Sequence, residues 1–192
     1  WIYQQGAAQR KDWEQVFSPD LVLGVSLSAT QFNMPNLVAE LRQVLSRHGL
    51  QPRQLEVEVT EAALTQNLDD TRKQLQLLRQ LGVRVALDDF GSGSCCLAYL
   101  RDLQLDTLKL DRHLIARLLT SPRDAAIARC VIDLCKQFDL LVIAEGVETL
   151  EQYQWLKANG CEYVQGFLVA RPLTASIASQ FAQPFDWSAL QA

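Results

Sequence analysis

Short apolar runs alternate along the chain with longer segments in which apolar residues recur every three or four positions. A short unbroken apolar run is typical of a strand buried on both faces, whereas three- and four-residue spacing indicates a helix with one apolar face. We therefore expect strands at 22–27, 55–59, 83–87, 105–110, 140–144 and 163–165. Helices are expected at 1–9, between Pro35 and Gly49, through Leu75 and Leu78 to Gly82, at 125–138 and at 150–160. This alternation predicts a parallel α/β sheet, and we take residues 1–192 as a single domain.

The number of strands leaves two architectures open. About six strand–helix units do not close an eight-stranded barrel, which takes about 250 residues. The chain therefore forms either an open six-stranded sheet or a TIM-like (β/α)8 barrel that is incomplete at its N-terminal end. Each predicted strand ends in polar or ionisable side chains: Ser26; Glu58 and Glu61; Asp88 and Asp89; Lys109 and Asp111; Glu145 and Glu148; and Gln165. Barrel enzymes collect their catalytic groups at these strand ends, so the pattern favours the incomplete barrel.

Two adjacent carboxylates, Asp88 and Asp89, follow an apolar run and precede the Gly91 turn. Neighbouring side chains of a regular strand point to opposite faces, so both acids can serve one site only where the strand ends and the backbone bends. Negative charge at the end of a buried strand is expensive unless cations lie there. The alternative is that one Asp caps the next helix while the other is solvated.

Composition narrows the class of protein. With 192 residues, of which 48% are apolar and 21% charged, the chain has an ordinary soluble balance. No apolar run approaches the roughly 20 residues that span a bilayer. The net charge is −4, with basic and acidic residues mixed, which argues against binding of duplex nucleic acid.

The five cysteines argue against a disulfide framework, because their number is odd and no C-x-x-C pair occurs. We therefore expect a reducing compartment, the cytoplasm. Cys130 shares one helical face with Ile127, Val131, Leu134 and Phe138, so we expect it in the core.

The strand-end residues suggest a metal site. Carboxylate oxygens from Glu58, Asp88, Asp89 and Glu145 suit hard cations such as Mg²⁺ or Mn²⁺. Two such ions about 3.5–4 Å apart can promote in-line displacement at phosphorus. The chain has only two histidines, which argues against a histidine zinc site and against a Ser-His catalytic triad.

Lys109 lies between two leucines near the end of an expected strand. A buried lysine is costly unless it meets an anion or a metal-bound water. The alternative is that its stem packs while its ammonium group reaches solvent.

Seven segments resemble the EAL domain family, bacterial phosphodiesterases that linearise cyclic di-GMP. The matching segments are 25–32 (VSLSATQF), 58–61 (EVTE), 87–93 (LDDFGSG), 108–111 (LKLD), 144–149 (AEGVET), 165–167 (QGF) and 171–173 (RPL). Their order and spacing across nearly the whole chain make the resemblance specific. It implies a (β/α)8-type barrel with a two-metal Mg²⁺ or Mn²⁺ site and cyclic di-GMP at the strand ends. A homodimer and a sensory or GGDEF domain in a longer parent protein are further partners that it implies.

The resemblance also implies roles for individual positions. These are metal binding at Glu58, Asp88, Asp89 and Glu145; catalysis at Lys109 and Glu145; substrate binding at Gln165, Arg171 and Pro172; and loop support at Glu61, Asp111 and Glu148.

Three departures from the family pattern predict reduced activity. The Glu-Ala-Leu segment is absent and should lie upstream of Trp1. Ser26 stands where the family has a metal-binding asparagine, and a serine hydroxyl is a poorer ligand than an amide oxygen. The loop after the Asp pair contains Cys95 and Cys96 where the family usually has Tyr-Ser-Ser; we interpret this pair as small-residue packing rather than redox chemistry.

Three functions follow from these observations. The first is metal-dependent hydrolysis of cyclic di-GMP, which we expect to be slow or absent in these 192 residues alone. The second is a degenerate domain that binds the dinucleotide, or a partner protein, without turnover. A more distant third is another metal-dependent barrel enzyme that forms an enolate with a lysine base.

Overall fold

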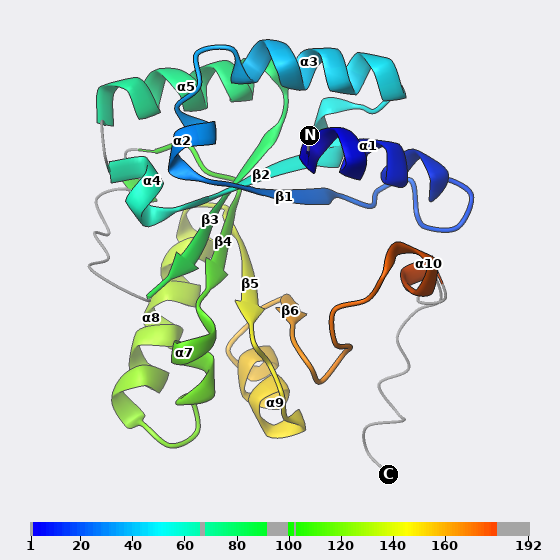
Figure 1. The fold of residues 1–192 in the computed structure, drawn as a ribbon. Helices are drawn as coiled ribbons and strands as arrows, with labels where there is room; N and C mark the ends of the chain where they lie inside the picture. The colour runs from blue at the N-terminus through cyan, green and yellow to red at the C-terminus, as the bar shows by residue number, and fades with distance from the viewer. Residues whose placement is uncertain (1, 66–67, 92–99, 102, 180–192) are drawn as a thin grey trace.

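A computed structural model describes residues 2–65, 68–91, 100–101 and 103–179 (Figure 1). Its centre is a six-stranded parallel sheet in which the strands follow one another in chain order. The strands are β1 (Leu23–Leu27), β2 (Leu55–Thr60), β3 (Arg84–Phe90), β4 (Thr107–Leu110), β5 (Leu141–Glu145) and β6 (Tyr163–Gln165). Every neighbouring pair is parallel. The six predicted strands are confirmed, and together they form a curled half-barrel, as the incomplete-barrel prediction required.

Helices cover the outside of the curled sheet (Figure 1). The longer ones are α1 (Ile2–Asp12), α3 (Leu37–His48), α5 (Leu68–Leu81), α8 (Pro122–Gln137) and α9 (Leu150–Ala158). The shorter ones are α2 (Ala29–Phe32), η1 (Pro52–Gln54), α4 (Glu61–Thr65), α7 (Arg112–Ala116) and α10 (Ala175–Ala178). The α1, α3 and α5 helices pack on the β1–β3 half, whereas α7, α8 and α9 lie along the β4–β6 half (Figure 1). Among the helices of the described residues, none has both the length and the apolar character needed to cross a bilayer.

The ends of the helices follow from local sequence. The α3 helix stops at Gly49, whose φ of 68° is the left-handed conformation that glycine adopts readily. At the start of α9, the Thr149 hydroxyl accepts a hydrogen bond from the Gln152 backbone N–H, and the Gln152 side chain accepts from the Thr149 N–H. This capping box fixes where the chain turns from the end of β5 into α9.

The core lies between the sheet and its helices. All four residues of β4 are buried, and β2 and β3 are buried along most of their length. The apolar stripe predicted for α3 is buried at Leu37, Leu41, Val44 and Leu45. Burial on both faces explains why these strands appear in the sequence as unbroken apolar runs.

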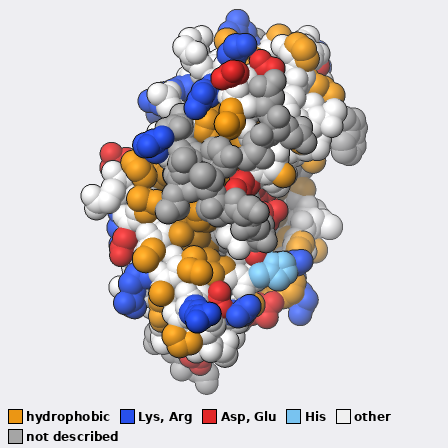
Figure 2. Space-filling view, turned by 90° about the vertical axis from the view of Figure 1, so that its left-hand side faces the viewer, with side chains coloured by type: hydrophobic (Ala, Val, Ile, Leu, Met, Phe, Trp, Pro, Cys, Tyr) orange, Lys and Arg blue, Asp and Glu red, His pale blue; other side chains and the backbone are white. Residues whose placement is uncertain are grey.

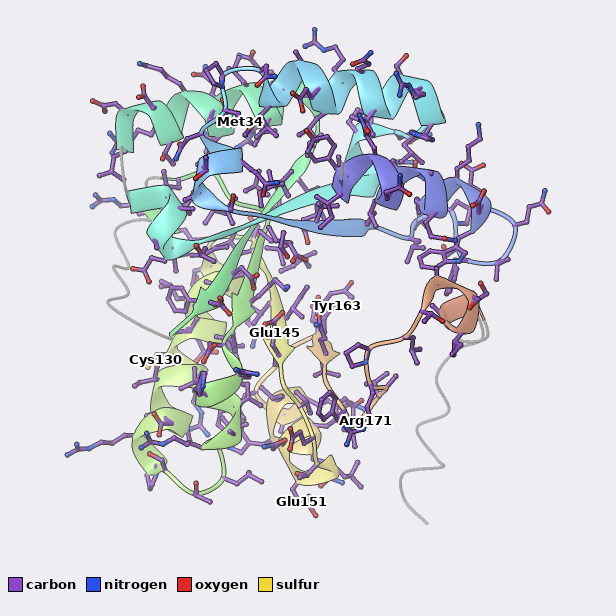
Figure 3. The ribbon with its side chains drawn as sticks, viewed as in Figure 1. Met34, Cys130, Glu145, Glu151, Tyr163 and Arg171 are labelled. Carbon is purple, nitrogen blue, oxygen red and sulfur yellow. The ribbon has the colours of Figure 1, made fainter. Side chains whose placement is uncertain are left out.

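The prediction that Cys130 lies in the core is wrong. Cys130 is exposed on the outer side of α8 (Figure 3), as are Ile127 and Phe138. The buried face of α8 consists of Ala128, Val131, Ile132 and Cys135. The predicted and buried faces share Val131, and Leu134 packs partly against the core, but the centre of the buried face lies toward Ile132 and Cys135. The exposed Ile127 and Phe138 made the neighbouring face look equally apolar in the sequence.

Candidate functional site

Lys109 is the centre of a cluster of charges at the carboxyl end of the sheet. Its side chain is buried, with 5% of the residue exposed. Its Nζ lies 2.7 Å from Glu145 Oε1, 3.1 Å from Glu58 Oε2 and 3.4 Å from Asp88 Oδ1. The expectation that a buried lysine would meet anions is therefore confirmed, and the solvent-reaching alternative is wrong.

These contacts keep Lys109 charged. Burial alone would lower the pKa of its ammonium group, but the hydrogen bond with Glu145 and the charges of Glu58, Glu145 and Asp88 outweigh burial and raise the pKa well above its usual value. Lys109 therefore contributes a permanent positive charge at neutral pH.

Parallel register brings these side chains together. Ser26 on β1 lies beside Glu58 on β2, and Glu145 on β5 lies beside Gln165 on β6. Because the strands are parallel, their carboxyl ends lie at the same edge of the sheet. Side chains alternate between the two faces along a strand, so those on the inner face at these ends point into one region inside the curled sheet. We call Glu58, Asp88, Lys109 and Glu145 the strand-end layer.

The Asp88–Asp89 pair lies within an irregular part of β3. The strand continues to Phe90, beyond the predicted end at residue 87, but its register with β4 shifts between Leu87 and Phe90. Asp89 has a φ of 57°, in the left-handed region that is uncommon for residues other than glycine. The predicted bend is therefore confirmed, and it occurs as a bulge inside the strand rather than after its end.

The bulge brings Asp89 beside Asp88 and Glu145. One carboxylate oxygen from each of these three residues lies within 4.8 Å of the other two. Burial, followed by the charges of Asp88 and Asp111, raises the pKa of Asp89. Burial also raises the pKa of Glu145, against the opposing effect of Lys109. We call Asp88, Asp89 and Glu145 the carboxylate triad.

The carboxylate triad fits a hard divalent cation. Its donors are all oxygen atoms, which Mg²⁺, Mn²⁺ and Ca²⁺ prefer, and they come from β3 and β5, on either side of β4 in the sheet. After burial, the charge of Asp88 is the next cause of the raised pKa of Asp89, and a bound cation would relieve this repulsion. Figure 2 shows acidic side chains gathered near the middle of one face of the molecule.

Glu58 does not belong to the carboxylate triad. Its Oε2 accepts a hydrogen bond of 2.8 Å from the Ser26 hydroxyl. Its Oε1 occupies the space above Gly24, where a Cβ atom would collide with it. The carboxylate of Glu58 is therefore turned toward β1.

A cavity of about 430 Å³ opens beside Glu145. It lies between the segments that follow β4, β5 and β6, and its lining includes Arg112, His113, Glu148, Gln165 and Phe167. Gln165 is thus brought to the site as expected.

Arg171 and Pro172 lie in the segment between β6 and α10 (Figure 3). The Arg171 guanidinium lies over the Phe167 ring, 4.3 Å from its centroid, which is a cation–π contact. Because Phe167 lines the cavity, this stacked pair lies at its edge.

The three loop-supporting candidates have different surroundings. Asp111 is buried and caps α7, since its Oδ1 accepts a 2.8 Å hydrogen bond from the His113 backbone N–H. Glu148 lines the cavity. Glu61 begins α4, but the loop that it is expected to support, together with Cys95 and Cys96, lies outside the described residues.

Gln152 is a residue of the site that was not predicted from the sequence. This residue is buried, and its Oε1 accepts hydrogen bonds from the backbone N–H groups of Glu148 (2.8 Å) and Thr149 (3.1 Å). Its Nε2 donates to the carbonyl of Ile115 at 3.2 Å. Gln152 therefore ties the loop after Glu145 to α7. The Thr149-x-x-Gln152 spacing, a capping-box pattern, was the available signal.

A second polar cluster lies deeper on the same strands. Glu56 is 6% exposed, and its Oε2 accepts a 2.6 Å hydrogen bond from the Thr107 hydroxyl. Arg84 Nε lies 3.5 Å from the same oxygen. We call Glu56, Arg84 and Thr107 the inner layer, which was not predicted from the sequence.

Comparisons with known proteins agree with this architecture. The family described as "EAL domain" matches residues 1–172. A cyclic di-GMP phosphodiesterase of Pseudomonas aeruginosa, NbdA, is 39% identical over 189 residues, which are 98% of this chain and 24% of that protein. The bifunctional diguanylate cyclase/cyclic di-GMP phosphodiesterase MucR of the same organism is 38% identical over 91% of this chain and 26% of its own length. The chain thus spans about a quarter of the length of these curated relatives.

A solved structure agrees as well. The PaMucR phosphodiesterase in complex with c-di-GMP superposes with a TM-score of 0.88 at 37% identity, covering 93% of this chain and 72% of that chain.

Proposed function

The chain belongs to the EAL domain family, and on that premise we propose that it hydrolyses cyclic di-GMP to linear pGpG in bacterial second-messenger signalling. The observation that carries the proposal is the strand-end layer, where the Lys109 ammonium group lies within 3.4 Å of carboxylate oxygens from three strands. The phosphodiesterase relatives named above support the substrate. The enolate-forming alternative has no such support.

The activity would depend on divalent cations, Mg²⁺ or Mn²⁺. The carboxylate triad would hold one ion, and Glu58 is the further carboxylate available for a second. Bound there, the ions would supply Lewis-acid stabilisation of the phosphodiester and of the attacking water. A relative, BlrP1 of Klebsiella pneumoniae, is described as a manganese and cyclic di-GMP complex, which supports this choice.

Hydrolysis to pGpG breaks one P–O3′ bond. A water adds to phosphorus, and the proton that it loses ends on the leaving 3′ oxygen. We assign Glu145 to take and return that proton, because its carboxylate lies beside the cavity and 2.7 Å from Lys109. Lys109, permanently charged and 2.7 Å from Glu145, would stabilise negative charge that develops on the phosphoryl oxygens.

The cavity beside Glu145 would hold part of the dinucleotide. Gln165 offers amide hydrogen bonds from its wall. The stacked Arg171–Phe167 pair and Pro172 provide a flat, cationic edge that suits a guanine base. The loop-supporting residues Glu61, Asp111 and Glu148 would hold the surrounding segments in place.

The wider setting is also part of the proposal. Since the curated relatives are about four times as long, the chain would act as the cytoplasmic portion of a larger signalling protein with a sensory or GGDEF domain, and as a homodimer.

A second function is a degenerate domain that binds cyclic di-GMP without turnover. The serine at position 26 favours it, because its hydroxyl bonds to Glu58 where the family has a metal-binding asparagine. We expect the 192-residue chain to hydrolyse slowly or not at all.

Chromatographic detection of pGpG distinguishes the two functions. Wild type and Ser26→Asn are incubated with cyclic di-GMP and Mg²⁺ or Mn²⁺, with Glu56→Gln as a variant outside the site. The phosphodiesterase proposal predicts slow turnover that Ser26→Asn accelerates. Tight binding of cyclic di-GMP by calorimetry without product in any variant would favour the degenerate domain.

A further inference from the structure

His113 is an exposed side chain with a restricted orientation. Its side chain is 73% exposed, whereas that of its partner, Asp111, is 5% exposed. One oxygen of this buried carboxylate, Oδ1, accepts from the His113 backbone N–H at 2.8 Å and also lies 2.8 Å from the ring Nδ1. An exposed side chain ordinarily keeps its rotamer freedom, which these two contacts with a buried acceptor remove.

The contact with Asp111 determines which atom of the ring is open to a ligand. An ionised carboxylate only accepts hydrogen bonds, so Nδ1 carries the hydrogen of this contact. In a neutral imidazole the other nitrogen, Nε2, is then an acceptor. Within the described part of the chain the ring makes no further hydrogen bond, so Nε2 is available to a ligand.

His113 lines the cavity of about 430 Å³ beside Glu145. It belongs to the segment after β4, whereas Phe167 belongs to the segment after β6. Because β5 lies between these strands in the sheet, the two residues border the cavity on either side of β5. A planar base that lies against the Phe167 ring would therefore turn its edge toward His113.

The chemistry of the cavity favours a base over a phosphate at His113. Two acids, Glu145 and Glu148, line the cavity with one permanent cation, Arg112, so a further anion would be repelled. An Nε2 without hydrogen also has nothing to donate to a phosphate oxygen. Guanine suits an acceptor here, because its Watson–Crick edge carries N–H donors at N1 and at the exocyclic amino group. Adenine has an acceptor at N1 and only a C–H group at C2.

We propose that His113, oriented by Asp111, accepts a hydrogen bond from the Watson–Crick edge of a guanine base in the cavity and thereby selects guanine over adenine. The inference rests on the proposed function for the dinucleotide substrate. It adds a residue that determines base specificity, which none of the strand-end carboxylates does. A site with an acceptor facing adenine N1 would leave both groups unpaired, and such a mismatch discriminates strongly.

Asparagine and glutamine distinguish the two ring nitrogens. The amide atoms of asparagine lie as many bonds from Cβ as Nδ1 does, and those of glutamine lie as many as Nε2 does. His113→Asn therefore keeps a contact with Asp111 but lacks an atom at the position of Nε2, whereas His113→Gln does the reverse. His113→Ala lacks both. His48→Gln is the matched control, because His48 ends α3, which packs on the β1–β3 half of the sheet.

Calorimetric titration with cyclic di-GMP in the presence of Mn²⁺ tests the proposal, with chromatography to confirm that the ligand stays intact. Competition against cyclic di-GMP gives the affinity for cyclic di-AMP. We expect His113→Ala and His113→Asn to weaken cyclic di-GMP binding by about tenfold, the size of one lost hydrogen bond. His113→Gln should weaken it by about threefold or less. Binding of cyclic di-AMP should change by less than about twofold in every variant, so the preference for guanine should narrow.

His48→Gln should change neither affinity, and circular dichroism melts of each variant confirm folding. Wild-type affinity for cyclic di-GMP in His113→Ala would overturn the proposal. Retained binding in His113→Asn with loss in His113→Gln would also overturn it, because the ring would then act only through Asp111. Equal weakening of both dinucleotides would overturn it as well, since it would place the contact on a phosphate or sugar that both ligands share.

The outcome is separable from that of the proposed function. Guanine-selective binding that depends on His113, without pGpG formation, would uphold this inference and remove the phosphodiesterase. Formation of pGpG with the same KM in wild type and His113→Ala would do the reverse. Absence of binding of either dinucleotide to the wild type would overturn both.

Discussion

Two polar layers lie on the same strands of this protein and differ in how their charges are balanced. In the inner layer, the Glu56 carboxylate is met by the Thr107 hydroxyl at 2.6 Å and by the Arg84 guanidinium at 3.5 Å. Glu56 thus has one hydrogen-bond donor and one cation, and both Glu56 and Thr107 are buried. In such a cluster, the hydrogen-bonding and charge requirements of each side chain are met by the others.

The strand-end layer is not balanced in this way. Lys109 makes direct ion pairs with three carboxylates, and Asp89 adds a fourth acid beside them. Burial raises the pKa of Asp89 and of Glu145, so negative charge on these carboxylates is costly in the metal-free protein. What distinguishes this candidate cation site from a structural cluster is therefore the excess of acids over cations, rather than the burial of charge.

Removing Lys109 should have the largest effect. Lys109→Met leaves Glu58, Asp88 and Glu145 without their shared cation, so we expect the metal-free protein to lose about 3 kcal/mol of stability. Turnover should fall by about 100-fold or more, because the charge near the phosphoryl group is lost. Urea unfolding with and without Mn²⁺ measures the first effect. Unchanged stability of the metal-free variant would show that Lys109 does not balance the layer.

Glu145→Gln should reduce turnover strongly while leaving substrate affinity nearly unchanged. The amide cannot take a proton and is a weaker cation ligand, so at saturating Mn²⁺ we expect kcat to fall by about 100-fold and KM to change less than threefold. Steady-state kinetics of pGpG formation measures both. A large rise in KM with constant kcat would assign Glu145 to binding alone.

The stability of the metal-free protein and its affinity for Mn²⁺ should depend on pH in opposite directions. Asp89 has a raised pKa, so in the metal-free protein its contribution to stability is fully present below the ordinary carboxyl pKa and is lost as pH rises through the raised value. Asp89→Asn should abolish this component of the pH profile. Mn²⁺ binding to the wild type should have the opposite trend and weaken as pH falls, because the ligand must be ionised.

Unfolding curves between about pH 4 and 8, without metal, compare wild type and Asp89→Asn over the range of carboxyl titration. Identical pH profiles of the two proteins would contradict the raised pKa.

The smallest effect is expected in the inner layer. Burial raises the pKa of Glu56, partly offset by the Thr107 hydrogen bond and the Arg84 charge. Glu56→Gln keeps an acceptor for Thr107, so stability should change by about 1 kcal/mol or less and Mn²⁺ affinity by less than twofold. Calorimetric titration of Mn²⁺ checks the second value. A tenfold loss of Mn²⁺ affinity would place Glu56 in the metal site and would show that the two layers are not separate.

Much of the fold was predictable, because the period and the length of an apolar run show whether a segment is a buried strand or a helix with one buried face. All six strands and the boundaries of α3 at Gly49 follow from such local signals. The face of α8 did not, because the predicted and buried faces of this helix overlap and only the packed sheet decides between them. The end of β3 was also missed, since a bulge at the Asp pair depends on the neighbouring strand.

The residues of the candidate site could be predicted from the sequence, but the contacts between them could not. Strand ends pointed to Glu58, Asp88, Asp89, Lys109 and Glu145, and the structure brings them together. The contact between Gly24 and Glu58, and the pairing of Glu56 with Thr107, depend on the register of separate strands. A single sequence carries no direct signal for such register.

The most direct test of the account is whether Mn²⁺ stabilises the fold through the strand-end layer. At about 100 times its Kd, a bound ion adds about 2.7 kcal/mol to the free energy of unfolding. We predict this increase for the wild type and for Glu56→Gln, and its loss in Asp88→Asn. Equal stabilisation of Asp88→Asn, or none in the wild type, would contradict the claim that the unbalanced carboxylates form a cation site.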